Sequence, residues 1–308
     1  MAKQPDEYNI DAVLKEMHKL YDKDPKAKAM LTTGDTIRKV FTDKDGVPVP
    51  TGHPLRELVG LPCVPYNKIV QFSGNPDTGK STVCGQLMAS AQKSNHIIVL
   101  LDTEDKMDAL RFEKHFGGDA KKILLIKTNE ILQGGEKVRK TILTIKTKYP
   151  DAKILFVWDS VGGSQSRSHA ERELDSEKHG QPGQDAKENG QVMKMLVALI
   201  NKYPDSIATV LANQVYAKIG FMQHGDKESG GKKIEFHSSL IIQLKRIKVL
   251  TKVVKGQKIK TGIITRATVA KNHLSQSETS LHQLDFEITA SGAGISAAQS
   301  LEDEADDE

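Results

Sequence analysis

Residues 74–81 carry a spacing that is typical of phosphate binding. They read Gly-Asn-Pro-Asp-Thr-Gly-Lys-Ser and match the pattern G-x-x-x-x-G-K-[ST] at every fixed position. Glycines let such a loop curl so that successive backbone N–H groups face a phosphate, and the helix that follows adds its positive end. Lys80 would reach the β- and γ-phosphates, and the Ser81 hydroxyl would ligate Mg²⁺. The motif predicts a nucleotide site formed by Gly74, Asn75, Pro76, Asp77, Thr78, Gly79, Lys80, Ser81 and Thr82.

Two acidic residues follow short apolar runs that predict buried strands. Ile154–Trp158 leads directly to Asp159, which is the arrangement in which an aspartate holds Mg²⁺ itself or through a water molecule. Ile97–Leu101 leads through Asp-Thr to Glu104, which would lie near the γ-phosphate as a general base for the attacking water. We expect a strand next to these two to carry the phosphate loop.

The elements that must position these residues alternate between strand and helix. Apolar runs predict strands over 68–72, 97–101, 123–126, 154–158 and 207–211, and the stretches between them predict helices over 82–92, 107–116, 131–149 and 192–203. Continuous apolar strands that alternate with helices are typical of a parallel sheet covered on both faces. We therefore predict an α/β fold with a mostly parallel sheet.

The pattern changes after residue 240, where strands follow one another without helices. They are expected over 240–244, 248–254, 263–269 and 284–288, and the turn Lys255–Lys258 would join two of them as a hairpin. The sheet should therefore end in an antiparallel extension.

Three segments are expected along the chain. Residues 1–45 show a helical pattern and would form a small N-terminal oligomerisation segment, while the Pro- and Gly-rich residues 42–54 indicate a linker or loop. Residues 46–292 would form the core that carries the nucleotide site. Residues 293–308 would be a disordered acidic tail.

Two polar stretches inside the core are longer than ordinary connections. They cover residues 162–190 and 215–233, and each follows a buried strand directly. Both should leave the carboxyl edge of the sheet, where ligands of open α/β folds bind. They are either functional loops or disordered insertions, and their position favours the first interpretation.

Composition excludes whole classes of protein. The chain has 308 residues, a formal net charge of +4, 38% hydrophobic residues and a mean hydropathy of −0.43, with no apolar run long enough to span a membrane. The N-terminus has no apolar stretch like that of a secretory signal, and two cysteines are too few for a disulfide framework. We therefore expect a reducing, cytoplasmic setting and no membrane partner.

Charge is distributed unevenly. Residues 302–308 hold six acids and no base, whereas residues 236–277 hold no acid and nine basic residues: Lys245, Arg246, Lys248, Lys252, Lys255, Lys258, Lys260, Arg266 and Lys271. This pattern indicates a polyanion partner and a tail that could compete with it. A solvated basic hairpin with a solubilising tail would give the same pattern.

The order of these motifs resembles that of the RecA-type recombinases, the ATPases that exchange homologous DNA strands, and is most similar to their phage-encoded forms. Residues 74–82 resemble the family's Walker A element, 98–108 the segment with its catalytic glutamate, and 154–161 its Walker B element. The most specific likeness is Leu-Ala-Asn-Gln at 211–214, followed by Ala-Lys-Ile-Gly-Phe-Met at 217–222 and a Gly pair at 230–231. It is similar to the family's second DNA-binding loop.

The resemblance implies a RecA-like fold and an ATP- and Mg²⁺-dependent enzyme that forms a filament on single-stranded DNA and pairs it with duplex DNA. Glu104, Lys80, Gln214, Lys271 and His273 would be catalytic, with Gln214 sensing the γ-phosphate and the last two acting in trans on a neighbouring subunit's nucleotide. Asp108 would contact the adenine side. The two long loops would line the filament axis, and the DNA contacts would be Lys218, Phe221, Met222, Lys227, Gly230, Gly231, Lys232, Arg167 and Arg172.

The family further implies mediator and single-strand-binding proteins as partners, in the cytoplasm of a bacterial or phage-infected cell. The chain departs from the family at His273 and Glu235, where lysines are usual, and its first loop has no clear likeness. Two other functions stay open. A RecA-fold hexameric helicase would share the phosphate loop and the glutamate, and a non-catalytic DNA-binding mediator would use nucleotide only as a structural ligand.

Overall fold

Five of the apolar runs form parallel strands of one sheet in the computed structural model. The strands are β3 (Ile69–Gly74), β4 (Ile97–Asp102), β5 (Ile123–Lys127), β6 (Ile154–Asp159) and β7 (Ile207–Ala217). With β9 (Leu240–Val254) they lie in the order β5-β4-β6-β7-β3-β9, and all neighbours are parallel. The predicted parallel α/β core is confirmed.

The structure describes residues 11–12, 15–16, 19, 40–169, 183–217, 226–228, 231–274, 282–289 and 292–294. Two compact units are distinguished, Met1–Val40 and Phe41–Glu308. Within the first unit the described residues 11–12, 15–16 and 19 are helical. Most of the predicted N-terminal segment and the tail from residue 295 lie outside the described residues, so their predicted roles stay predictions.

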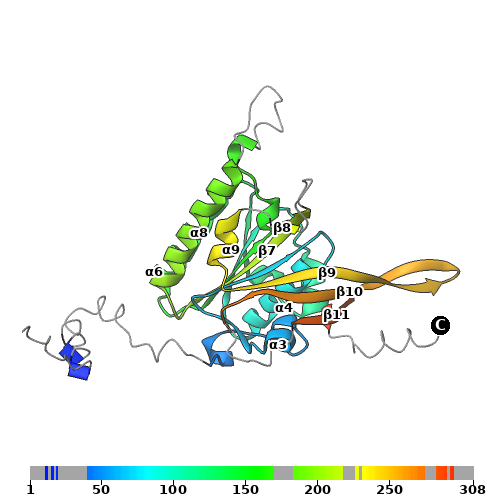
Figure 1. Cartoon of the computed structure of the whole chain (residues 1–308), viewed down its shortest axis with the longest axis horizontal. Coiled ribbons are helices and arrows are strands. Elements are labelled where there is room, and N and C mark those ends of the chain that lie inside the picture. The colour runs from blue at the N-terminus through cyan, green and yellow to red at the C-terminus, as the bar shows by residue number, and fades with distance from the viewer. Residues whose placement is uncertain are drawn as a thin grey trace, which may run out of the picture. The chain divides into compact units, whose positions relative to one another are not determined.

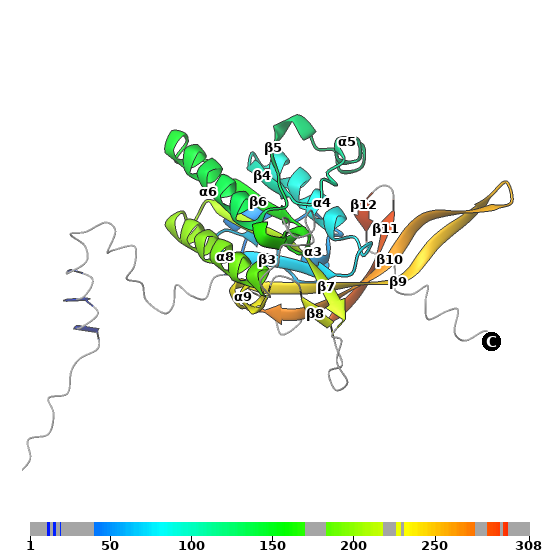
Figure 2. The same cartoon turned by 90° about the horizontal axis from the view of Figure 1, so that it is seen from above.

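Antiparallel strands extend the sheet beyond β9. They are β10 (Gln257–Asn272), β11 (Gln283–Thr289) and β12 (Gly292–Gly294), and a short β8 (Asp226–Glu228) pairs with β7. Lys255 and Gly256 have φ of 49° and 79°, the left-handed pair that a two-residue hairpin turn needs. The β9–β10 hairpin reaches well beyond the rest of the sheet (Figures 1 and 2).

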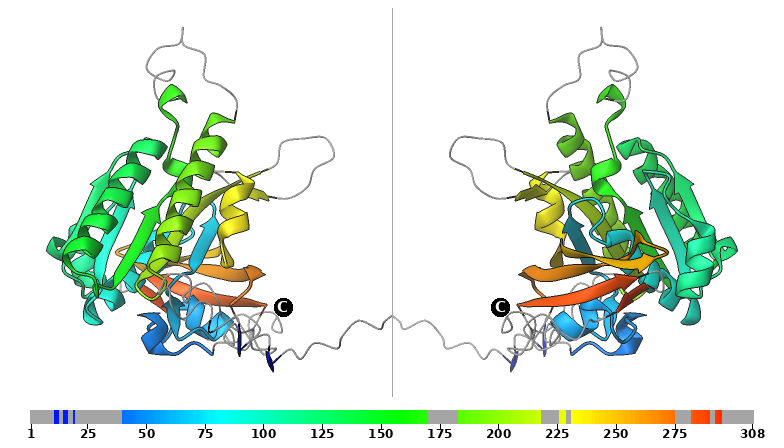
Figure 3. Two further views of the ribbon diagram at one scale, coloured as in Figure 1. Left: turned by 90° about the vertical axis from the view of Figure 1, so that its left-hand side faces the viewer. Right: turned by 90° about the vertical axis from the view of Figure 1, so that its right-hand side faces the viewer.

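Helices cover both faces of the sheet. One face packs α3 (Pro54–Val59), α4 (Lys80–Lys93) and α5 (Ala109–Phe116) against the strands, and the other packs α6 (Ile131–Lys148), α8 (Gln184–Lys202) and α9 (Lys232–His237). Figure 2 shows α6 and α8 side by side, and Figure 3 shows this green layer on a different side of the strands from the blue α3. Side chains alternate between the two cores because successive strand residues point to opposite faces.

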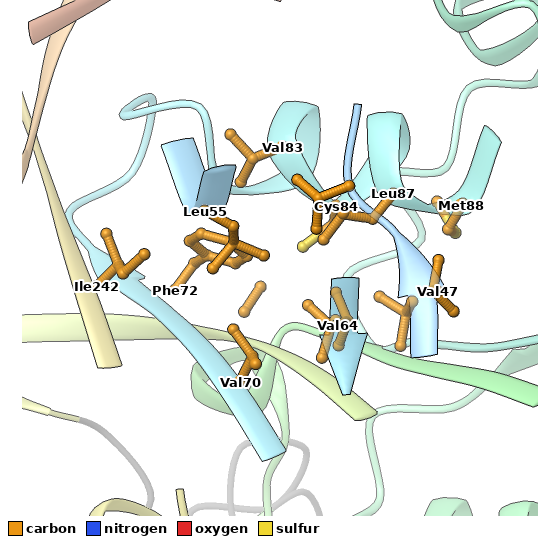
Figure 4. Packing of buried hydrophobic residues seen from close by; sticks show 14 of the residues in the cluster. Val47, Leu55, Val64, Val70, Phe72, Val83, Cys84, Leu87, Met88 and Ile242 are labelled. Atoms are coloured by element: carbon orange, nitrogen blue, oxygen red, sulfur yellow. The ribbon is translucent and has the colours of Figure 1, made fainter. Parts of the chain in front are cut away.

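Residues 42–54, predicted as a linker or loop, are part of the core instead. β1 (Gly46–Pro48) pairs with β2 (Cys63–Pro65), and Val47 and Leu55 are buried beside Val83 and Leu87 of α4 (Figure 4). The Ser90 hydroxyl of α4 also donates to the Pro48 carbonyl at 2.6 Å. Val47 and Val49, which alternate with glycine and proline, give this segment apolar side chains to bury, which its Pro and Gly content concealed.

Other element boundaries also differ from the predictions. The expected strands 240–244 and 248–254 form the single strand β9, since Lys245, Arg246 and Ile247 between them can stay exposed on the hairpin. α8 begins at Gln184, so residues 184–190 of the polar stretch 162–190 are helical and not loop. β7 continues to Ala217 and α9 begins at Lys232, which shortens the second stretch at both ends.

Candidate nucleotide site and its links to the loops

The predicted phosphate loop connects β3 to α4 at the carboxyl edge of the sheet. Asp77 and Gly79 have φ of 60° and 93°, so the backbone curls as the motif requires. A side chain at position 79 would be doubly unfavourable, because its Cβ would lie 1.9 Å from Ile288 Cδ1 as well as in a left-handed conformation. Residues 75–79 thus bring the chain to Lys80 and Ser81 at the N-terminus of α4, which suits an anion.

Lys80 is held inside this loop. Its side chain is buried, and Nζ donates to the carbonyl oxygens of Gly74 at 2.9 Å and Asn75 at 2.8 Å. Burial lowers the pKa of Lys80 below its usual value, although the charges of Asp159 and Glu104 oppose that shift. The ammonium group therefore lies at the loop and donates to two neutral carbonyl oxygens, which phosphate oxygens could replace.

Ser81 and Asp159 lie close enough to share one cation. Burial raises the pKa of Asp159, and the nearby acids Glu104 and Asp102 raise it further, whereas a hydrogen bond with the Ser81 side chain lowers it. A divalent cation would offset this repulsion. In the described part of the chain, no group of three or more His, Cys, Asp or Glu side chains could hold a metal. The two oxygens therefore fit Mg²⁺ that takes its other ligands from phosphates and water.

Glu104 receives three side-chain hydrogen bonds. Gln214 Nε2 donates to Oε1 at 2.8 Å, the Ser160 hydroxyl donates to the same oxygen, and Lys106 Nζ donates to Oε2. Burial alone would raise the pKa of Glu104, but these three bonds lower it below its usual value. The three donors therefore favour the charged form of this carboxylate and fix its position near the phosphate loop.

Gln214 reaches Glu104 because of the strand order. β7 lies between β3 and β6, with Gly74 opposite Gln214 and Asp159 opposite Ala212. We expected the phosphate-loop strand beside the strands of Asp159 and Glu104, and the structure corrects this. β7 thereby places Gln214 beside Gly74 of the phosphate loop and within hydrogen-bond distance of Glu104.

The first long loop starts against the same pair of side chains. A Cβ at Gly162 would lie 2.6 Å from Gln214 Cβ, and one at Gly163 would lie 2.5 Å from Glu104 Cγ. Gly163 N donates to the Ser160 hydroxyl at 3.1 Å, and Trp158 Nε1 donates to Ser164 Oγ at 3.0 Å. Because Gly162 and Gly163 lie directly against Gln214 and Glu104, a movement of either side chain would displace the start of this loop.

These groups open into a cavity of about 680 Å³. Asp108 lines it and caps α5, where its carboxylate accepts from Arg111 N at 3.0 Å. The cavity is also lined by residues that were not among the predicted site residues, including Lys106, Arg111, Ser160 and Lys260. Lys106 and Ser160 lie inside the segments 98–108 and 154–161, but only their contacts single them out. Arg111 lies one helical turn into α5 and donates to Thr82 Oγ1 at 2.8 Å, so it joins α5 to the start of α4.

Comparison with known proteins agrees with this geometry. The sequence model of the family described as RecA N-terminal domain matches residues 9–296. The chain belongs to this family. Three relatives named Protein RecA are similar to it. That of a Nitratiruptor species is 26% identical over 96% of this chain and 78% of its own length. That of Nautilia profundicola is 28% identical over 73% of this chain and 63% of its own length. That of Mycobacteroides abscessus is 27% identical over 98% of this chain and 80% of its own length.

These relatives come from bacteria, and the expected likeness to phage-encoded members of the RecA family in particular stays a prediction. None of the helices in the described ranges is long and apolar enough to cross a membrane.

Lys271 and His273, the residues expected to act in trans in a RecA-family member, lie far from their own phosphate loop. They flank Asn272, which pairs with Leu240, and Leu240 pairs with Val70 at the beginning of β3. The phosphate loop follows the other end of that strand. Lys271 Nζ donates to the carbonyl oxygens of Glu235 and Phe236, and His273 is exposed. Within one chain the two residues therefore cannot contact the nucleotide that the loop would bind.

The predicted DNA contacts are only partly described. Arg167 and Lys232 are exposed, and Gly231 has φ of 88° and packs against Ala186 of α8. A Cβ at Gly190 would lie 2.5 Å from Lys233 Cδ, so the end of the second loop rests on the helix that follows the first. Lys227 lies in β8, whose side chains are not described, and Arg172, Lys218, Phe221, Met222 and Gly230 lie outside the described residues.

Proposed function

We propose that this chain is an ATP-dependent recombinase that assembles as a filament on single-stranded DNA and pairs it with a homologous duplex. The single observation that carries the proposal is the 2.8 Å hydrogen bond from Gln214 to Glu104, at the end of the strand that leads into residues 215–233. One side chain thereby joins the candidate water-activating group to the segment that resembles a DNA-binding loop. The relatives named Protein RecA support the same class of function.

The chemistry follows from the groups around the phosphate loop. Bound Mg²⁺ neutralises charge on the phosphate oxygens, and Ser81 and Asp159 would hold it from the protein side. Lys80 would give up the carbonyl oxygens of Gly74 and Asn75 for phosphate oxygens, which bind an ammonium group more strongly. Glu104 would take the proton of the attacking water.

A neighbouring subunit would complete the site. Because Lys271 and His273 lie at the edge of the sheet away from their own phosphate loop, they are available to the nucleotide of another copy. Each copy would then contact the next one head to tail. Head-to-tail contacts build an open helical filament when the chain of subunits does not close into a ring.

The edge strand β5 offers a surface for contact between copies. It ends the parallel side of the sheet, and Leu124 and Leu125 are 44% and 40% exposed. An edge strand, paired on one side only and carrying exposed leucines, is a template for pairing with another chain. We propose that a second copy of this chain covers it in the filament.

The projecting hairpin supports a polyanion partner. Its outer half is exposed and includes Lys252, Lys255 and Lys258. Lysines on an exposed ribbon can neutralise phosphates without reading sequence, and such binding weakens as salt rises.

ATP turnover measured with and without single-stranded DNA, across a salt series, tests the proposal. We expect turnover that needs Mg²⁺, is stimulated by single strands and loses that stimulation as salt increases. Stimulation by duplex DNA alone, or none at all, would contradict it. Electron microscopy of the complex separates the helicase alternative, since closed rings in place of filaments would favour a motor.

A further inference from the structure

The short loop between β4 and α5 is held in one shape by two carboxylates. Asp102 is buried, and its side chain accepts the backbone N–H groups of Glu104 at 3.2 Å, Lys106 at 3.3 Å and Met107 at 2.9 Å. Asp105 has φ of 52° and pairs with Lys127 of β5 at 2.5 Å. The loop is thus fixed from the sheet side and from the neighbouring strand, and this directs the side chain of Lys106.

Lys106 lies among the groups that surround the phosphate loop. Its Nζ donates to Glu104 Oε2, and this hydrogen bond raises its pKa, to which the charges of Asp159 and Asp77 add. In turn, its charge contributes to the lowered pKa of Lys80. Lys106 also lines the same cavity as Lys80 and Asp159, so its ammonium group borders the space in which the phosphates of a bound triphosphate would lie.

We propose that Lys106 is a catalytic residue that contacts the γ-phosphate of ATP bound in its own subunit and leaves Glu104 when it does so. This rests on the proposed ATP site. Without nucleotide, Glu104 is the partner of Lys106. A triphosphate carries more negative charge than one carboxylate and would draw the ammonium group away, so that Glu104 keeps Gln214 and Ser160 as donors and gains room for water.

The step that follows is a simple displacement. The water oxygen forms a bond to the γ-phosphorus, the bond from that phosphorus to the bridging oxygen of ADP breaks, and one proton of the water passes to the Glu104 carboxylate. Lys106 keeps its proton and neutralises charge on the γ-phosphate oxygens. Once it contacts the γ-phosphate, the ammonium group would stabilise the charge that develops there in the transition state.

Substitution of Lys106 tests this role directly. The side chain is 72% exposed, so Lys106→Met should fold like the parent protein. We expect its kcat for ATP with single-stranded DNA to fall about 100-fold, the usual effect of losing one preorganised donor. Its affinity for ADP should stay within about twofold, whereas its affinity for ATPγS should fall about tenfold, since only the latter has a γ-phosphate. Lys106→Arg should restore most of kcat because it keeps the charge.

Lys121→Met, which removes an exposed lysine from the neighbouring 3-10 turn Ala120–Lys122, is the matched control and should behave as the parent. The inference is overturned if Lys106→Met keeps kcat within about threefold of the parent, or if it loses ADP and ATPγS binding equally. Failure of the proposed function looks different, because the parent protein itself would then show no turnover above that of Lys80→Ala.

Discussion

Acidification should destabilise this protein through a histidine next to the phosphate-loop helix. His53 is fully buried, its Nδ1 accepts from Leu55 N at 3.1 Å, and its Nε2 lies 3.2 Å from the Val83 carbonyl oxygen of α4. Its ring also packs edge-on against Phe72 of β3, with the centroids 6.0 Å apart. Because Nδ1 accepts one bond and Nε2 donates the other, an added proton on Nδ1 would break the cap of α3.

Burial lowers the pKa of His53 from 6.5 to about 4, with the hydrogen bond to Val83 opposing this in part. The unfolded chain therefore binds the proton more readily, and the free energy of unfolding falls as the pH drops below 6.5 and levels off below about 4. At pH 5 the ratio of protonated to neutral His53 is about 30 in the unfolded chain, whereas His53 of the folded protein is still mostly neutral. The free energy of unfolding is therefore about 2 kcal/mol lower at pH 5 than at pH 7.5.

Urea unfolding followed by circular dichroism at pH 7.5 and pH 5.0 measures this loss. His53→Asn is the matched variant, since asparagine keeps an oxygen that can cap α3 but has no proton to gain. The variant should be less stable at pH 7.5, yet its stability should fall by about 2 kcal/mol less between the two pH values. His96 and Asp159 also titrate abnormally but are common to both proteins, so they cancel. An equal loss in parent and variant would refute the assignment to His53.

Three further outcomes follow from the site and the sheet edge. Glu104→Gln should reduce ATP turnover roughly 10²- to 10⁴-fold while nucleotide binding is retained, and comparable turnover would remove Glu104 as the base. Gln214→Ala should keep basal turnover within about tenfold but lose stimulation by single-stranded DNA, which ATP turnover measured with and without single strands would check. Leu125→Lys should lower the sedimentation coefficient of the assembled protein without changing the thermal midpoint, because the side chain is exposed and the added charge opposes strand pairing.

The sequence predicts the parts of this site that depend on local pattern. The apolar runs before Gly74, Glu104 and Asp159 are strands, and the residues after them meet at one edge, as parallel strands require. Strand order is a different matter, since it depends on which surfaces pack best over the whole sheet. The position of β7 beside β3 could therefore not be predicted from the local pattern.

The site residues that the sequence did not predict owe their roles to tertiary contacts. Lys106 and Ser160 matter because both donate hydrogen bonds to Glu104. Lys106 lies two residues after Glu104, whereas Ser160 follows the neighbouring strand β6. Residues 42–54 looked like a linker because Pro and Gly disfavour regular structure, although the valines between them are buried. Such roles depend on tertiary neighbours, which local spacing does not record.

Trp158 gives this molecule a built-in optical reporter. It is the sole tryptophan of the chain, it is fully buried immediately before Asp159, and its indole N–H is bonded to Ser164 at the root of the first long loop. The emission spectrum and lifetime of Trp158 therefore report solvent entry and structural rearrangement at the start of this loop, without an attached dye. Stopped-flow records of this natural signal can time how quickly a ligand at the phosphate loop is felt by the segment beyond it.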